Sequence, residues 1–122
     1  MEFNNNKPIY LQLVDYFLEK ILRKEILPGD KIMSVRRLAE LAQVTPNTAS
    51  RAYAYMQQLG IVYNKRGIGL FVSENAYEKA KMIKKTEFIE KDLPKFFNTL
   101  DILNIDFKEL EKLYNNKKNK ML

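Results

Sequence analysis

The sequence contains no cysteine and no histidine. Their absence removes disulfides, the usual ligands of structural zinc, thiol nucleophiles and the side chain that most often acts as a general base. The sequence also lacks a glycine-rich phosphate loop and the Gly-x-Ser-x-Gly turn of serine hydrolases. Sites built from Asp, Glu, Lys or Ser stay open in principle. We nevertheless expect a protein that is not an enzyme and that uses no cofactor and no metal ion.

Long apolar runs are absent as well. No run approaches the roughly 20 residues that a membrane-spanning helix needs, and the N-terminal sequence MEFNNNKP lacks the regions of a secretory signal. With 46% hydrophobic and 30% charged residues, the composition is that of a globular chain. The 122 residues suffice for one compact domain and a short appendage. We expect a cytoplasmic protein with no membrane partner.

Acidic residues are scarce in the middle third of the chain. Residues 31–73 contain one acidic residue, Glu40, and carry a net charge of +5, whereas the whole chain carries +6. The basic residues of this segment are Lys31, Arg36, Arg37, Arg51, Lys65 and Arg66. Such an excess favours a polyanionic partner. An ordinary solvated surface is the alternative, and charge by itself does not exclude it.

The N-terminal part of the chain predicts a helix from Pro8 to about Glu25, ended by the Pro28-Gly29-Asp30 turn. Its apolar residues form two neighbouring stripes. One stripe is Tyr10, Leu13, Phe17 and Ile21, and the other is Leu11, Val14, Leu18 and Leu22. The core of one small domain rarely buries two such stripes of the same helix. We therefore expect the second stripe to pack against the C-terminal segment or another subunit.

Two short amphipathic helices follow. Ser34 is a suitable N-cap for the first, and the apolar residues expected on its buried side are Val35, Leu38, Ala39, Leu41 and Ala42. After a turn at residues 43–44, Thr45 caps a second helix whose first residue is Pro46. This helix should end at Leu59, with Gly60 in the left-handed conformation.

The second of these helices has one apolar and one polar side. Ala49, Ala52, Tyr53, Met56 and Leu59 share the apolar side, whereas Asn47, Arg51, Tyr55 and Gln58 project from the other. Asn can pair with adenine, Arg can bind guanine or phosphate, and Thr48 can reach a phosphate oxygen. Capping of the first helical turn is the alternative role for Asn47 and Thr48, and the two roles are compatible.

A two-stranded hairpin is predicted next, because residues 61–63 and 70–72 are rich in strand formers and flank the turn sequence at 64–69. Its two glycines permit a tight bend and a close approach to DNA, and Lys65 and Arg66 place positive charge at the tip. A plain basic turn is the alternative. Helix, helix and hairpin in this order predict a winged helix-turn-helix, which lays one helix in the DNA major groove.

Residues 7–72 resemble the DNA-binding domain of GntR-family transcriptional regulators. The resemblance is carried by Pro-Ile-Tyr-x-Gln at residues 8–12, Pro-Gly-Asp at 28–30, Ser-Val-Arg-x-Leu-Ala at 34–39, Asn-Thr at 47–48 and Arg-Gly-x-Gly at 66–69, which Phe71 and Val72 follow. Thr-Pro-Asn-Thr followed by Arg-Ala-Tyr, together with a short tail, is most similar to the small YtrA-type branch. Two positions depart from the family pattern: Met33 replaces a usual proline, and Ser50 stands where many members have a basic residue.

The resemblance implies a homodimeric repressor that binds a two-half-site operator in double-stranded DNA, with its own operon and transporter genes as targets. It assigns DNA contacts to Arg36, Thr45, Asn47, Thr48, Arg51, Arg66 and Gly67, to which the charge pattern adds Lys65. The tail is too short for the effector domains of larger members, so no small-molecule effector is expected.

The C-terminal residues 74–122 have a helical pattern. The apolar positions are Ala76, Ala80, Ile83, Ile89, Leu93, Phe96, Phe97, Leu100 and Leu103, and then Phe107, Leu110, Leu113 and Tyr114. Pro94 should kink or interrupt the first helix. Asn104 can end it in a left-handed turn, and Asp106 with Glu109 can start the last helix.

We therefore predict a mainly α protein with a small hairpin, made of a winged helix-turn-helix DNA-binding domain (1–73) and a helical dimerisation segment (74–122). The C-terminal helices expose more apolar surface than one winged helix can cover, which favours a dimer. The same helices could instead fold back on the first helix of their own chain. A protein-interaction module on a winged-helix scaffold is the alternative function, and RNA binding is a third.

Overall fold

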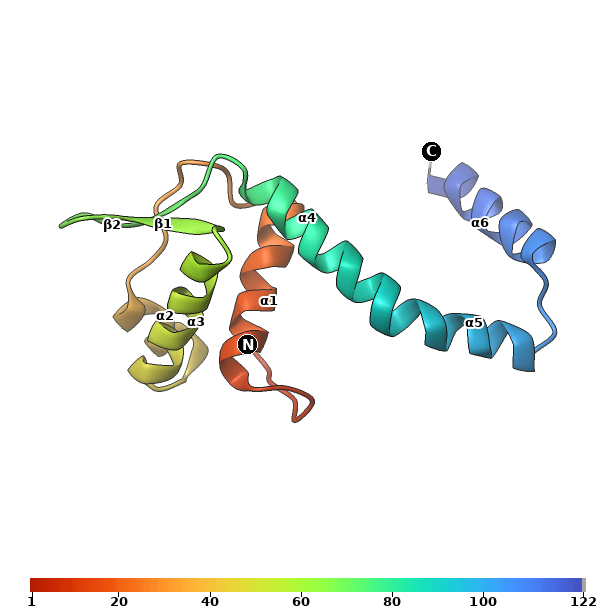
Figure 1. The fold of residues 1–122 in the computed structure, drawn as a ribbon, viewed down its shortest axis with the longest axis horizontal. Helices are drawn as coiled ribbons and strands as arrows, with labels where there is room; N and C mark the ends of the chain where they lie inside the picture. Colours follow the sequence, from red (N-terminus) through yellow and green to blue (C-terminus); the bar gives the residue numbers. More distant parts are fainter. Residues whose placement is uncertain (122) are drawn as a thin grey trace. The chain divides into compact units, whose positions relative to one another are not determined.

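The computed structural model describes residues 1–121, and the chain forms two compact units with their boundary in the sequence after Ile83. The first unit holds α1 (Ile9–Leu22), α2 (Val35–Ala42), α3 (Pro46–Gln58), β1 (Val62–Lys65), β2 (Gly69–Val72) and the start of α4 (Ala76–Glu87) (Figure 1). The second holds the π-helical turn η1 (Phe88–Asp92), α5 (Leu93–Ile102) and α6 (Phe107–Met121). The mainly helical fold with one hairpin is thus confirmed. Among the described residues, no helix is both long enough and apolar enough to cross a membrane.

The core of the first unit lies where α3 packs against α1 and α2 (Figure 1). Buried residues come from both apolar stripes of α1: Leu13, Val14, Phe17, Leu18 and Ile21. They join one core with Ala76 and Ala80 of α4. The second stripe is therefore covered within this unit, and the compact unit continues past residue 73 into α4.

The helix-turn-helix begins and ends where local chemistry predicts. The Oγ of Ser34 accepts a hydrogen bond from the N–H of Arg37 at 3.1 Å, Thr45 caps α3, and Gly60 has a φ of +77°. At Gly60 an added Cβ would also lie 2.3 Å from the Nζ of Lys79 on α4. The positive φ therefore favours glycine at this position, whereas the nearby Nζ is the end of a flexible side chain that can move aside.

Two helical expectations are wrong. The first helix ends at Leu22 and not near Glu25, because Lys24 adopts a φ of +62° and turns the chain before Pro28 is reached. Leu41 is 52% exposed instead of buried. The core-facing arc of α2 is narrow, and at 100° per residue Leu41 lies outside it. The buried residues of α2 are Leu38, Ala39 and Ala42.

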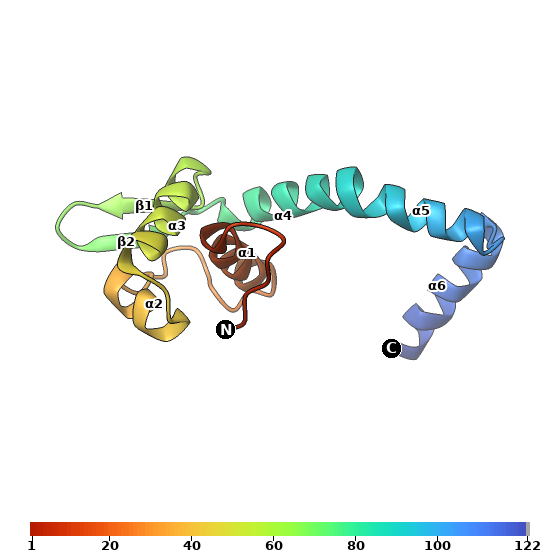
Figure 2. The same cartoon turned by 90° about the horizontal axis from the view of Figure 1, so that it is seen from below.

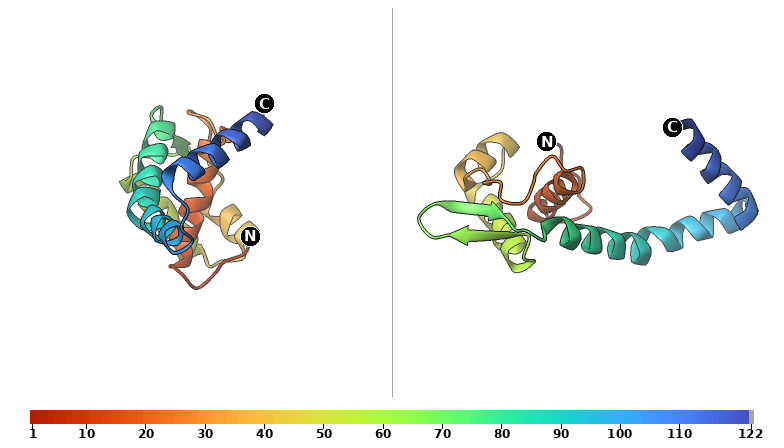
Figure 3. Two further views of the ribbon diagram at one scale, coloured as in Figure 1. Left: turned by 90° about the vertical axis from the view of Figure 1, so that its right-hand side faces the viewer. Right: turned by 90° about the horizontal axis from the view of Figure 1, so that it is seen from above.

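The hairpin is present, but its strands extend farther toward the tip than expected. Lys65 pairs with Gly69, which leaves a turn of residues 66–68. The segment before α2 continues the pairing: Lys31 bridges Phe71, and the N–H of Ile32 donates to the carbonyl of Leu70 at 2.8 Å. The hairpin is thereby tied to the start of the helix-turn-helix, from which it projects (Figures 2 and 3).

In the second unit, a π-helical turn accommodates Pro94. Proline offers no N–H, and its ring would collide with the carbonyl four residues earlier in a regular α-helix. The N–H of Leu93 donates to the carbonyl of Phe88, five residues back, so the turn is wider at this point. Asn104 then ends α5 with a φ of +57°, and the Oδ1 of Asp106 accepts from the N–H of Glu109 at 2.8 Å. Both predicted signals are confirmed.

Candidate nucleic-acid interface

The first turn of α3 is held by Thr45. Its Oγ1 accepts a hydrogen bond from the N–H of Thr48 at 3.2 Å and lies 2.9 Å from the Oγ1 of Thr48. Thr48 therefore takes part in the capping of the first turn, and its hydroxyl has a partner inside that turn. Asn47 is exposed, and no hydrogen bond of its amide is found among the described residues. The amide of Asn47 thus remains available for another molecule.

The outer side of α3 exposes Asn47, Ser50, Arg51 and Gln58, opposite the buried Ala49, Ala52, Tyr53 and Met56. Tyr55 does not project as expected. It is half-buried and packs edge-on against Tyr10 of α1, with ring centroids 6.1 Å apart and planes at 87°. The guanidinium carbon of Arg51 lies 4.2 Å from the centroid of the same Tyr10 ring. An aromatic residue of α1 therefore borders the exposed side of α3.

The two arginines of α2 share one carboxylate. The Nε of Arg36 lies 3.6 Å from one oxygen of Glu40, and an Nη of Arg37 lies 3.7 Å from the other. All three side chains are exposed, so these ion pairs are weak. In the part of the chain that the structure describes, no acidic partner is found for Lys31, Arg51, Lys65 or Arg66. The basic residues without an acidic partner thus lie on α3, on the hairpin and at Lys31, which bridges to β2.

The tip of the hairpin consists of Arg66, Gly67 and Ile68, closed by a hydrogen bond from the N–H of Ile68 to the carbonyl of Lys65 at 2.9 Å. Lys65 itself belongs to β1, and its Nζ lies 4.6 Å from the ring centroid of Phe71. The positive charge at the tip is therefore that of Arg66. At Gly67 the φ is +78°, and an added Cβ would meet no protein atom within 4 Å. The backbone at this glycine is open to a close approach.

One long-range hydrogen bond connects α3 to the segment before α2. The hydroxyl of Tyr53 donates to the carbonyl of Met33 at 2.8 Å, and Tyr53 is 3% exposed. Burial raises the pKa of this hydroxyl well above its ordinary value. The backbone carbonyl of Met33 thus helps to fix how α2 and α3 are oriented, and the side chain at this position takes no part in that bond.

The Tyr53 hydrogen bond leads to a pH-dependent prediction. Tyr53→Phe is expected to lower the unfolding free energy by about 1 kcal/mol at pH 7. Because the folded pKa is raised, the hydroxyl stabilises the fold fully below pH ~10, the ordinary tyrosine pKa, and loses that contribution as pH rises further. The difference between wild type and variant should therefore shrink from pH 10 upward. Urea unfolding at pH 7 to 11 measures it, and a constant difference would contradict the prediction.

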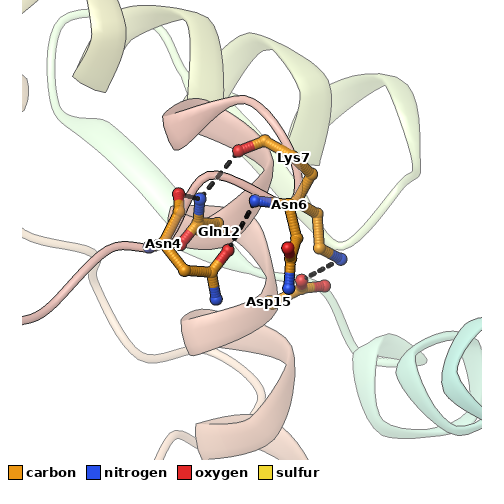
Figure 4. Close-up of polar contacts among 5 residues, drawn as sticks. All are labelled: Asn4, Asn6, Lys7, Gln12 and Asp15. Carbon is orange, nitrogen blue, oxygen red and sulfur yellow. Dashed lines mark hydrogen bonds and ion pairs between the residues drawn. The ribbon is translucent and has the colours of Figure 1, made fainter.

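The chain before α1 is pinned by Gln12 (Figure 4). Its Nε2 donates to the carbonyls of Asn4 and Lys7 at 2.8 and 2.7 Å, and its Oε1 accepts from the N–H of Asn4 at 3.0 Å. Lys7 also forms an ion pair with Asp15. These contacts fix the first turn of α1, where Tyr10 lies. Apart from the place of Gln12 in the Pro-Ile-Tyr-x-Gln motif, nothing in the sequence indicates this role.

The family model "Bacterial regulatory proteins, gntR family" matches residues 9–72, which include α1, α2, α3 and the hairpin. Among curated proteins, the chain is 37% identical over 114 residues to the HTH-type transcriptional repressor YtrA of Bacillus subtilis, covering 90% of this chain and 82% of YtrA. It is 49% identical over 75 residues to the HTH-type transcriptional regulator YhcF of the same organism, and that match spans 62% of each chain. Both relatives are transcriptional regulators and not enzymes.

Solved structures agree with these relatives. A GntR-family transcriptional regulator from Bacteroides thetaiotaomicron superposes with a TM-score of 0.80 at 35% identity, over 94% of this chain and all of that one. The DNA-binding domain of AraR in complex with operator ORX1 superposes with a TM-score of 0.55 at 26% identity, over 59% of this chain and 93% of that one. The first match spans most of this chain, and the second is about as long as the segment from the N-terminus to the end of β2.

Proposed function

The chain belongs to the GntR family of bacterial regulatory proteins, and from this premise we propose that it is a cytoplasmic homodimeric repressor that binds a two-half-site operator. The observation that carries the proposal is the surface formed by α3 and the hairpin. Asn47 and Arg51 stand exposed on the helix that the Thr45 cap starts, and Arg66 occupies the hairpin tip. A helix in the major groove with a basic wing beside it is the arrangement that such a surface fits.

The proposed DNA contacts divide into two kinds. The free amide of Asn47 suits adenine, and the guanidinium of Arg51 suits guanine, so both would read bases. The remaining proposed contacts would hold the sugar-phosphate backbone, which positions a protein without selecting sequence. They are Arg36, Thr45, Thr48, Lys65, Arg66 and Gly67. The open backbone at Gly67 supports its assignment, because a phosphate or a groove edge could approach there without a clash.

The second unit supports dimerisation. Phe88, Phe97, Phe107 and Tyr114 help to line an apolar groove of about 530 Å³ on η1, α5 and α6. Phe107 is 75% exposed and Tyr114 59% exposed. Aromatic residues left open to this degree usually mark an interface. We assign the groove to a second copy of the chain, because a symmetric dimer would present two recognition helices to successive major grooves about 34 Å apart.

Binding to the DNA upstream of the protein's own gene tests the proposed function. Wild-type protein is titrated against a labelled duplex of that region at several salt concentrations, with excess random duplex as competitor. We expect salt-sensitive binding that survives the competitor, and a footprint with two half-sites. Binding no tighter than to the random duplex would contradict the proposal.

Two substitutions separate base reading from backbone contact. Asn47→Ala is expected to weaken operator binding about tenfold while leaving affinity for random duplex nearly unchanged, because one base-pair discrimination is worth ~1–3 kcal/mol. Arg66→Ala should instead weaken binding to both duplexes by similar factors. Parallel titrations of the two variants measure this difference. Equal losses of Asn47→Ala on both duplexes would remove its base-reading role.

A further inference from the structure

Tyr10 of α1 lies under the guanidinium of Arg51 of α3, with the guanidinium carbon 4.2 Å from the ring centroid. Within about 6 Å such a contact attracts the cation to the face of the ring. We propose that Tyr10 is a positioning residue of the DNA interface, which holds the Arg51 side chain in the orientation that it uses on the operator. The inference rests on the proposed function and adds to it a residue outside the helix-turn-helix.

The contact with Tyr10 leaves Arg51 able to bind. A guanidinium carries five N–H donors, and an aromatic ring on one side of the group accepts a hydrogen bond from none of the N–H groups that lie in its plane. No carboxylate competes for them, since no acidic partner of Arg51 is found among the described residues. Arg36 on α2 differs, because Glu40 already contacts its guanidinium. The side chain of Arg51 is therefore held by Tyr10, and its N–H groups have no acidic partner among the described residues.

The ring beneath Arg51 is itself fixed. Tyr10 is half-buried and meets Tyr55 of α3 edge-to-face at 6.1 Å. The segment that precedes it is pinned by the hydrogen bonds of Gln12 to Asn4 and Lys7. A rigid support reduces the conformational entropy that a long side chain loses on binding. Removing the ring should consequently cost about three- to tenfold in operator affinity.

Three variants of α1 test the inference. Tyr10→Leu keeps an apolar side chain but removes the aromatic face, whereas Tyr10→Phe keeps the face. Tyr16→Leu is the matched control. Tyr16 lies on the same helix and has a cation, the Nζ of Lys20, over its ring, but it does not contact Arg51. Each variant is titrated with the operator duplex and with random duplex, and urea unfolding confirms that it is folded. Tyr10→Met replaces Tyr10→Leu if the leucine variant does not fold.

We expect Tyr10→Leu to lower operator affinity three- to tenfold and random-duplex affinity less than twofold, with Tyr10→Phe and Tyr16→Leu within twofold of wild type on both. In an Arg51→Ala background, Tyr10→Leu should cause no further loss. Unchanged operator affinity, an equal loss on both duplexes, or the full loss in the Arg51→Ala background would each overturn the inference. A wild-type protein that does not prefer the operator would overturn the proposed function together with it.

Discussion

Phe107→Asp is expected to convert the protein to a folded monomer and to weaken binding to a two-half-site operator by about a hundredfold or more. Phe107 is 75% exposed at the start of α6 and lines the apolar groove. A carboxylate buried against a second copy would be left without a partner, which a dimer tolerates poorly. Two linked half-site contacts gain a factor of ~10²–10⁴ over one, and the monomer forfeits that factor.

The fold should survive this substitution. Phe107 is the first residue of α6, where an acidic side chain is favourable because the helix dipole is positive at that end. Lys112→Asp is the control: it places the same residue on α6 outside the groove lining, so it should leave the dimer intact. Analytical ultracentrifugation and operator titration measure both variants. A Phe107→Asp protein that remains dimeric would show that the groove is not the interface.

Leu13→Ala should have the second largest effect, on stability. Leu13 is 0% exposed in the core where α1 and α3 pack together. Truncating a fully buried leucine removes its packing and leaves a cavity, which costs ~2–5 kcal/mol. For a unit of this size that loss should lower the thermal midpoint by more than about 10 °C.

Leu41→Ala is the matched control for Leu13→Ala. The same atoms are removed from a side chain that is 52% exposed on α2, and surface substitutions of this kind change stability by about 0.5 kcal/mol or less. Calorimetry of the two variants measures the difference. Similar losses for both would mean that Leu41 is packed in solution, as its apolar character alone would suggest.

Local signals in the sequence predicted the ends of most elements. Ser34, Thr45, Asn104 and Asp106 each perform the capping or turning role expected of them, because that chemistry depends on residues within one helical turn. The two-stranded hairpin followed similarly from its strand-forming residues and glycines. Leu41 shows the limit of the approach: helical spacing identifies an apolar side of α2 but not how wide an arc the neighbouring helices cover.

The candidate interface was predicted as a set of residues, but its geometry was not. Arg51 was expected to project freely, whereas a tyrosine far away in the sequence lies against it. The side chain of Gln12 and the bridge from Lys31 to Phe71 likewise join segments distant along the chain. Periodicity within one element carries no information on such contacts. They arise from the packing of one element on another.

The carboxylate that Arg36 and Arg37 share alters how many ions the DNA must release on binding. Affinity falls with salt in proportion to the number of phosphates that a protein neutralises, since each neutralised phosphate frees a condensed counterion. Because Glu40 contacts both arginines, the net charge that α2 presents to the duplex is closer to +1 than to +2. Residues 31–73 should therefore displace fewer counterions from DNA than their six basic residues suggest. The affinity of the protein for DNA should depend correspondingly less on the ion concentration in the cell.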